Sequence, residues 1–101
     1  LKQKKKIQKV ETYKLAKNPN SGEVVKLNVK GQIMMIDITE FAKGDYKCEL
    51  IDLEGDVIRF SKIFSQSHQV NCENFIEGIY LFNIYSKSVL ISSFRLQIFN
   101  N

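Results

Sequence analysis

The sequence contains no tryptophan, one proline, one histidine and two cysteines, Cys48 and Cys72. These few soft ligands, without a CxxC spacing, cannot complete a four-ligand zinc site. No run of about 18 apolar residues is present, so we predict no membrane span, and no signal-peptide core follows the lysine-rich start. No nucleophile, base and orienting group form a recognisable set, so we expect no catalytic residue, no metal or cofactor and no enzyme.

The 101 residues, 44% of them hydrophobic and 26% charged, suffice for one globular domain with a single core. The formal net charge is +4, but the excess is local, because residues 1–9 hold five lysines and no acid. We therefore predict a basic linker or tail over residues 1–9 and a single β-sandwich domain over residues 10–101. That domain is nearly neutral and has no basic stripe with interleaved aromatics, so we expect no nucleic-acid partner. The chain begins with Leu1, which we interpret as the start of a mature or excised piece.

Apolar and polar residues alternate over most of the chain from Val10 onward, and turn residues recur about every 8 to 12 positions. This pattern predicts an all-β domain, an immunoglobulin-like antiparallel β-sandwich of about seven strands. Seven or eight candidate strands are expected, over residues 11–16, 23–29, 33–38, 46–53, 57–64, 69–72, 79–85 and 89–99.

Proline and glycine indicate where the chain turns. Asn18 and Pro19 are expected in a loop, because proline cannot donate to a strand ladder. Gly55, in the segment 53–56, supplies the positive φ that a tight hairpin turn needs. A second hairpin is expected at residues 86–88, which contain no glycine.

The last candidate strand shows which residues should face the core. Phe94, Leu96 and Ile98 alternate with Arg95 and Gln97. A period of two predicts that the three apolar residues face inward and the two polar ones outward.

The motif Phe-x-x-Gly-x-Tyr occurs twice, at residues 41–46 and 75–80. In β-sandwiches a tyrosine at the start of a strand commonly donates its hydroxyl to a backbone carbonyl a few residues upstream and fixes the corner between the sheets. We predict this role for Tyr46 and Tyr80, where the glycine two residues earlier lets the backbone turn.

The histidine and the two cysteines could have structural rather than functional roles. His68 lies in a polar segment and is expected to be a solvent-exposed loop residue rather than a catalytic base. Cys48 and Cys72 are in register with apolar neighbours, so they are expected to point inward as small hydrophobes. A disulfide between them stays open, because it depends on the distance between their α-carbons.

Two groups of residues could bind a ligand. The acids around the first hairpin turn match no EF-hand calcium loop and are expected to form a charged turn. They are Glu49, Asp52, Glu54 and Asp56. Exposed aromatics could form a sugar-binding platform, with Tyr13 and Tyr85 as candidates. Five further aromatics are expected in the core, namely Phe41, Phe60, Tyr80, Phe82 and Phe94.

The order of these motifs resembles the C-terminal sorting domains of proteins exported by the type IX secretion system of Bacteroidetes. The resemblance covers residues 13–99 and rests on the Asn-Pro loop, the hairpin at 51–57, the motif at 75–84 and the closing strand at 92–99. The residues that we assign to these motifs and to recognition are Asn18, Pro19, Asp52, Gly55, Gly78, Tyr80, Phe94, Arg95, Leu96 and Ile98.

This resemblance implies a non-catalytic domain that targets an exported cargo protein to the type IX translocon and the cell surface. The implied partners are the translocon, an outer-membrane shuttle protein, a sortase that cleaves the domain off, and an N-terminal cargo domain of the same precursor. The implied location is the periplasm in transit, then the outer membrane, the cell surface or the extracellular space. We further expect a carrier to recognise residues 89–101 by backbone pairing along an exposed strand edge.

An immunoglobulin-like accessory, adhesin or carbohydrate-binding module of an exported protein fits the composition equally well. Position in the parent protein separates the two hypotheses, because a sorting domain is C-terminal and removable. A sugar-binding module would also expose a pair of aromatic side chains on one face.

Overall fold

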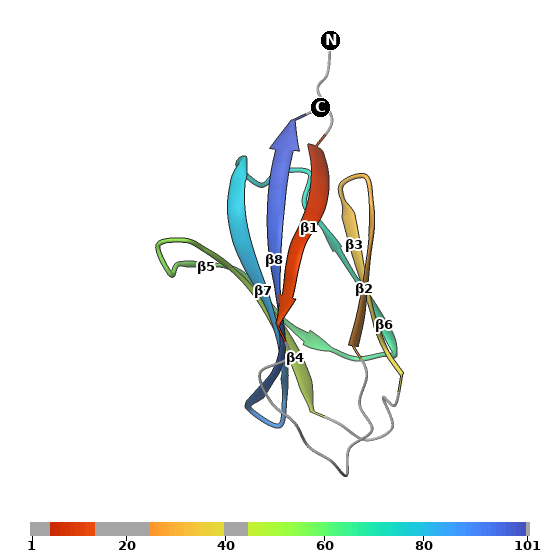
Figure 1. Ribbon diagram of the computed structural model, residues 1–101. Helices are drawn as coiled ribbons and strands as arrows, with labels where there is room; N and C mark the ends of the chain where they lie inside the picture. Colours follow the sequence, from red (N-terminus) through yellow and green to blue (C-terminus); the bar gives the residue numbers. More distant parts are fainter. Residues whose placement is uncertain (1–4, 14–24, 40–44, 101) are drawn as a thin grey trace.

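The computed structural model describes residues 5–13, 25–39 and 45–100. Over these ranges the chain forms strands and no helix (Figure 1). The strands are β1 (Lys5–Tyr13), β2 (Val25–Lys30), β3 (Ile33–Ile38), β4 (Tyr46–Asp52), β5 (Val57–Ile63), β6 (Ser67–Asn71), β7 (Gly78–Ser86) and β8 (Val89–Asn100).

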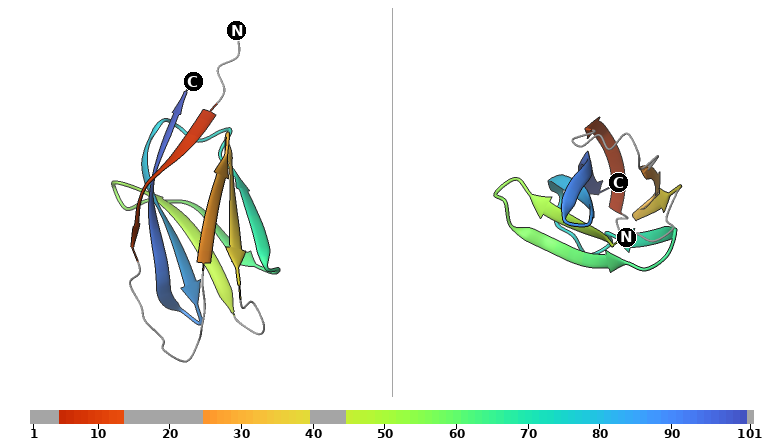
Figure 2. Two further views of the ribbon diagram at one scale, coloured as in Figure 1. Left: turned by 45° about the vertical axis from the view of Figure 1, so that its right-hand side comes forward. Right: turned by 90° about the horizontal axis from the view of Figure 1, so that it is seen from below.

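The strands form two antiparallel sheets. One sheet has five strands in the order β1-β8-β7-β4-β5, and the other has three in the order β2-β3-β6. Figure 2 shows the two sheets on opposite sides of a common interior. The antiparallel sandwich predicted from the alternating pattern is therefore present.

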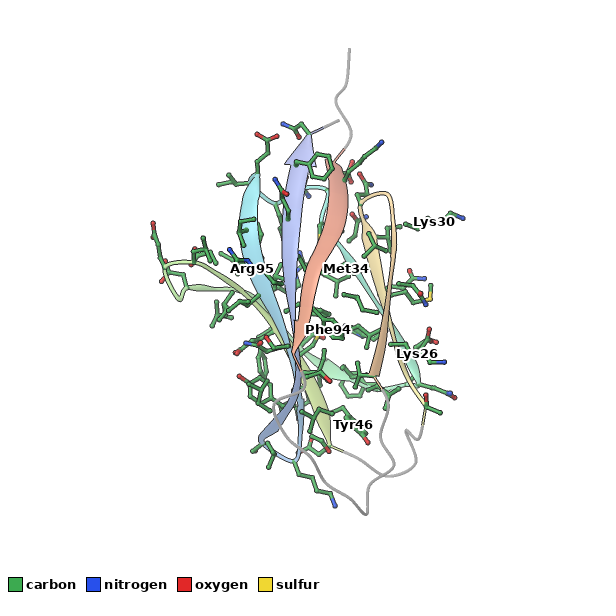
Figure 3. The ribbon with its side chains drawn as sticks, viewed as in Figure 1. Lys26, Lys30, Met34, Tyr46, Phe94 and Arg95 are labelled. Atoms are coloured by element: carbon green, nitrogen blue, oxygen red, sulfur yellow. The ribbon has the colours of Figure 1, made fainter. Side chains whose placement is uncertain are left out.

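The core lies between the sheets and follows the predicted alternation. Met34, Ile36 and Ile38 are fully buried on β3, and Phe94 and neighbouring apolar residues of β8 pack opposite them. Figure 3 shows Met34 between the two sheets. Burying a side chain of this size contributes about 1.5–3 kcal/mol to folding, so β3 and β8 together supply much of the driving force.

The β4–β5 hairpin has the turn that Gly55 predicts. Gly55 has a φ of 89°, and its N–H donates to the Asp52 carbonyl over 3.1 Å. The Asp52 carboxylate accepts the backbone N–H groups of Glu54 and Asp56, each over 2.9 Å. The hairpin prediction is confirmed, and Asp52 satisfies the donors that the tight turn leaves free.

Strand β1 begins inside the segment expected to be a linker. It pairs with β8 from Lys5 opposite Asn100 to Tyr13 opposite Ser93, with a bulge after Lys9. The Ile7 side chain is 8% exposed, and its N–H donates to the Gly31 carbonyl over 3.1 Å. Lysine is a common residue on edge strands because it disfavours further pairing, so a lysine run is compatible with a strand as well as with a tail.

The β7–β8 hairpin turns on two residues that are not glycine. Lys87 and Ser88 have φ values of 50° and 68°, and Ser86 pairs directly with Val89. The hairpin predicted at residues 86–88 is confirmed. Its two central residues are left-handed, as in a type I′ turn, a conformation that costs most residues about 1–2 kcal/mol and suits Asn-Gly best.

We predict that the double substitution Lys87→Asn with Ser88→Gly raises the free energy of unfolding by about 1 kcal/mol, because both new residues tolerate positive φ. Urea denaturation monitored by fluorescence or circular dichroism measures this as a higher midpoint at unchanged slope. Asn74→Gly is the matched control, since Asn74 lies in a turn without a positive φ. A gain in the control and none in the double variant would contradict the prediction.

Candidate functional site

The C-terminal hairpin lies in the middle of the five-stranded sheet. From Ser93 to Ile98, β8 pairs with β1 on one edge and with β7 on the other, and the pairing with β1 continues to Asn100. The exposed backbone edge expected over residues 89–101 is therefore wrong for this stretch of the folded chain. The physical reason is that residues 5–13 form a strand and occupy the edge themselves.

The recognition residues predicted on β8 fall on both faces of the sheet. Phe94, Leu96 and Ile98 are no more than 2% exposed and define the core. Arg95 is half-buried on the opposite face, where it pairs with Leu81 of β7 (Figure 3). Of these predicted residues of β8, Arg95 is the one that presents a side chain to an external partner.

The corner that precedes β7 has the predicted tyrosine bond. The Tyr80 hydroxyl donates to the Ile76 carbonyl four residues upstream. Its ring lies 6.3 Å from the Phe75 ring, and the Arg59 guanidinium lies 5.0 Å from the centre of the Phe75 ring. The corner is confirmed at Tyr80, with Gly78 between the bonded residues.

Other predicted positions lie partly outside the described residues. Asn18, Pro19 and Phe41 are in the ranges that the structure does not describe. The first copy of the motif is described only at its end, where Tyr46 is buried at the start of β4.

The acidic residues around the first hairpin separate into two groups. Carboxylate oxygens of Asp52, Glu54 and Asp56 lie within 4.8 Å of one another at the exposed tip. The hydrogen bonds from the turn backbone to Asp52 account for its position. Glu49 lies elsewhere, on the outer face of β4, the face turned away from the core.

Glu49 organises a polar network that sequence reasoning missed. Its Oε1 accepts the Tyr85 hydroxyl over 2.6 Å and the Asn83 amide over 3.3 Å. The Asn83 carbonyl oxygen accepts the Ser93 hydroxyl over 2.6 Å. The hydrogen bond to Glu49, with burial, raises the pKa of Tyr85 to about 12. The network links β4, β7 and β8, and it uses the Tyr85 hydroxyl that a sugar platform would need.

The sequence feature that could have predicted this network is the position of its polar residues opposite one another on neighbouring strands. Asn83 pairs with Glu49 on one side and with Ser93 on the other, so the three residues form one row across the sheet. Residues directly opposite in an antiparallel pair share a face. Recognising the row requires the register between strands, which a single sequence does not state.

The aromatic and histidine predictions need two corrections. Phe60, expected in the core, is 56% exposed because it lies on the outer face of the edge strand β5. His68, expected in an exposed loop, lies in β6 opposite Ile36 and is half-buried. Burial lowers the pKa of His68 below its ordinary value, because it disfavours the charged imidazolium.

The two cysteines are buried free thiols, as expected of small hydrophobic residues. Burial raises the pKa of Cys48 to about 11 and that of Cys72 to about 12, with the Arg59 charge acting weakly in the other direction. The structure therefore holds no disulfide between them, and neither thiol is poised as a nucleophile.

Among the described residues no helix is long and apolar enough to cross a membrane. The fold itself is shared with a solved structure, a DUF3244 family protein from Bacteroides vulgatus with an immunoglobulin-like β-sandwich fold. The two share 15% sequence identity and superpose with a TM-score of 0.65, covering 94% of this chain and 98% of that one. This likeness shows that the chain is an immunoglobulin-like sandwich.

Residues 18–96 match the family model described as the secretion system C-terminal sorting domain. The match covers most of the chain, so the protein belongs to this family of type IX secretion sorting domains, which is non-catalytic in general. No curated protein matches the sequence. The family predicted from the order of the motifs is confirmed.

We predict that Tyr80→Phe lowers the free energy of unfolding by about 1–2 kcal/mol, because the Ile76 carbonyl loses its donor. Burial raises the pKa of Tyr80 above 10.0, with a smaller effect of the Asp52 charge. The stability that the protonated hydroxyl supplies is thus complete below pH 10 and is lost as the pH rises through the folded-state pKa. Urea titrations at pH 7 and above pH 10 should show a difference from wild type that shrinks at high pH; a difference independent of pH would point to packing alone.

We predict that both thiols resist alkylation in the native protein. At pH 8 a pKa of about 11 gives a thiolate fraction about 100-fold below that of the same thiol at its ordinary pKa of 9.0. Iodoacetamide labelling followed by mass spectrometry should therefore be slow in buffer and fast in 8 M urea, a concentration chosen as roughly fully denaturing. Equal rates under both conditions would contradict the burial of Cys48 and Cys72.

Proposed function

We propose that this domain directs an exported cargo protein to the type IX translocon and on to the cell surface. The observation that carries the proposal is the family match over residues 18–96, which includes β2 to β7 and ends within β8. The partners that follow from this function are the translocon, an outer-membrane shuttle protein, a sortase and a cargo domain on the N-terminal side of β1. The accessory-module alternative has no comparable observation in its favour.

The architecture constrains how a partner reads the folded domain. Because β8 is paired on both edges from Ser93 to Ile98, backbone addition there is blocked while β1 stays in place. Asn83 and Ser93 of the outer face are buried, but other outer-face side chains of β7 and β8 are partly or fully exposed. Leu81 pairs with Arg95 and Ile79 pairs with Gln97, which gives a small mixed patch at the centre of the sheet.

We therefore assign the predicted recognition residues two roles. Phe94, Leu96 and Ile98 hold β8 in the core, and Tyr80 holds the corner before β7. Arg95, with the outer-face residues around it, is the contact that we assign to the secretion machinery. A charge change at Arg95 tests that contact without entering the core.

A secretion assay tests the proposal. Residues 1–101 are fused behind a signal peptide and a fluorescent reporter in a type IX-competent bacterium, and reporter is measured at the surface and in the periplasm. We expect export of the full fusion and periplasmic retention of a fusion that ends at Ser88, which lacks all of β8. We also expect Arg95→Glu to reduce surface reporter several-fold.

Lys26→Glu is the matched control, because Lys26 is exposed on β2 and the charge change is identical. Its export should equal that of the unmodified fusion. Thermal denaturation of both purified variants verifies that they are folded. Retention of the full fusion in the periplasm would reject the sorting function, and equal export of Arg95→Glu and Lys26→Glu would reject the role of Arg95.

A further inference from the structure

Strand β5 is an edge strand with an unusual number of exposed apolar side chains. Of the seven large hydrophobic side chains that are exposed in the described part of the chain, five lie in residues 53–64. They are Leu53, Val57, Ile58, Phe60 and Phe64, with exposed fractions from 40% to 82%. Sheet edges are usually protected by charge or by covering elements, so this concentration indicates a contact surface.

Register shows that the apolar edge continues onto the outer face of the sheet. Val57 pairs with Ile51, and Ile51 pairs with Leu81 of β7. Leu50 faces the core, so its neighbour Ile51 and the residues opposite it lie on the outer face. In Figure 1 the tip of the β4–β5 hairpin projects from the side of the molecule. Within the described residues β5 is hydrogen-bonded to β4 alone, and its other edge is free.

Charges of opposite sign flank this apolar edge. Asp52, Glu54 and Asp56 lie at the tip that precedes β5. Lys62 lies near the far end of β5 and is directly opposite Lys47 of β4. On its outer face the edge therefore runs from an acidic end through an apolar middle to a basic end. Arg59, the cation in the middle of β5, is opposite the core-facing Leu50 and lies over the Phe75 ring, on the inner face.

A second copy of the same strand, placed antiparallel, has the complementary pattern. The acidic tip of each copy then lies beside the lysines of the other, and the apolar centres meet. This arrangement is two-fold symmetric and closes with one pair of copies. An antiparallel β5 also supplies backbone partners for the free edge. The opposite edge has a different charge pattern, since its strand carries three lysines, Lys5, Lys6 and Lys9, and one acid, Glu11. This net positive charge repels a second copy.

We propose that two copies of this chain associate through antiparallel pairing of β5, which joins their five-stranded sheets into one. The inference is independent of the sorting function, because the surface lies on the far edge of the sheet from β8 and β1. A seven-residue strand edge buries less area than a standard protein interface. The dimer is accordingly weak, and concentration controls its population.

Analytical ultracentrifugation of the 101-residue chain tests the proposal between roughly 10 µM and 1 mM, the range for a small interface. We expect a reversible monomer–dimer equilibrium. Val57→Lys should raise the dissociation constant at least about tenfold, because it replaces one of the apolar side chains of the edge by a charge. Val89→Lys is the matched control, since Val57 and Val89 are 55% and 54% exposed and the charge change is the same.

A charge exchange tests the antiparallel orientation. Asp56→Lys and Lys62→Asp should each weaken self-association, because each replaces an attractive contact between copies by a repulsive one. The double variant should recover the wild-type dissociation constant. An equimolar mixture of the two single variants should form a heterodimer more readily than either variant dimerises alone.

Three results of these experiments would contradict the proposed dimer. A chain that stays monomeric over the whole range has no such interface. Equal effects of Val57→Lys and Val89→Lys would place association elsewhere on the surface. Failure of both the double variant and the mixture to recover association would exclude the antiparallel β5 contact. Thermal denaturation of all variants verifies that they are folded, and export of the reporter fusion is unaffected by any of these results.

Discussion

The sandwich depends on the insertion of β8 between β1 and β7. This strand has a hydrogen-bonded neighbour on each side and contributes Phe94, Leu96 and Ile98 to the core. It is also the last strand of the chain, and β1 is the first. Within the described residues β1 pairs with β8 alone in the five-stranded sheet, so that sheet is complete only when both β1 and β8 are in place. Pairing between strands so far apart in the sequence slows folding. The five-stranded sheet is complete only after β8 has been made and has paired with β1.

The same arrangement limits what a partner can use. A free strand edge would let a partner read the backbone with little dependence on side chains. In the folded domain that edge of β8 is taken by β1 from Ser93 to Asn100, so a partner that recognises this stretch must contact its side chains or displace β1. Hydrogen bonds between side chains hold part of this outer face in place. Glu49, Asn83 and Ser93 form one hydrogen-bonded row across three strands, which fixes the surface on which Arg95 and its neighbours lie.

Short sequence patterns correctly predicted those strands and turns whose structure depends mainly on nearby residues. The alternation in β3 and β8, the positive φ of Gly55 and the Tyr80 corner all depend on interactions within a few residues or on one buried face. The misassigned positions depend on which strands become neighbours. Lys5 to Lys9 belong to a strand because β8 offers them an edge. His68 is half-buried because β6 pairs with β3, and Phe60 is exposed because β5 has a neighbour on one side only. Sheet order is a property of the whole chain, so a period-two pattern does not contain it.

The two edges of the five-stranded sheet then differ for a physical reason. An edge strand exposes backbone donors and acceptors that attract another strand. On β1 the lysines oppose that attraction, and this protection matters because β1 lies beside the strand that completes the core. On β5 the exposed side chains are mainly apolar, and the charges sit at its two ends with opposite sign. On β1 three lysines outnumber the single acid, Glu11, so this edge repels a second copy of itself. An acid-to-base gradient instead repels a parallel neighbour and attracts an antiparallel one. Charge on this sheet thus excludes pairing at one edge and selects its direction at the other.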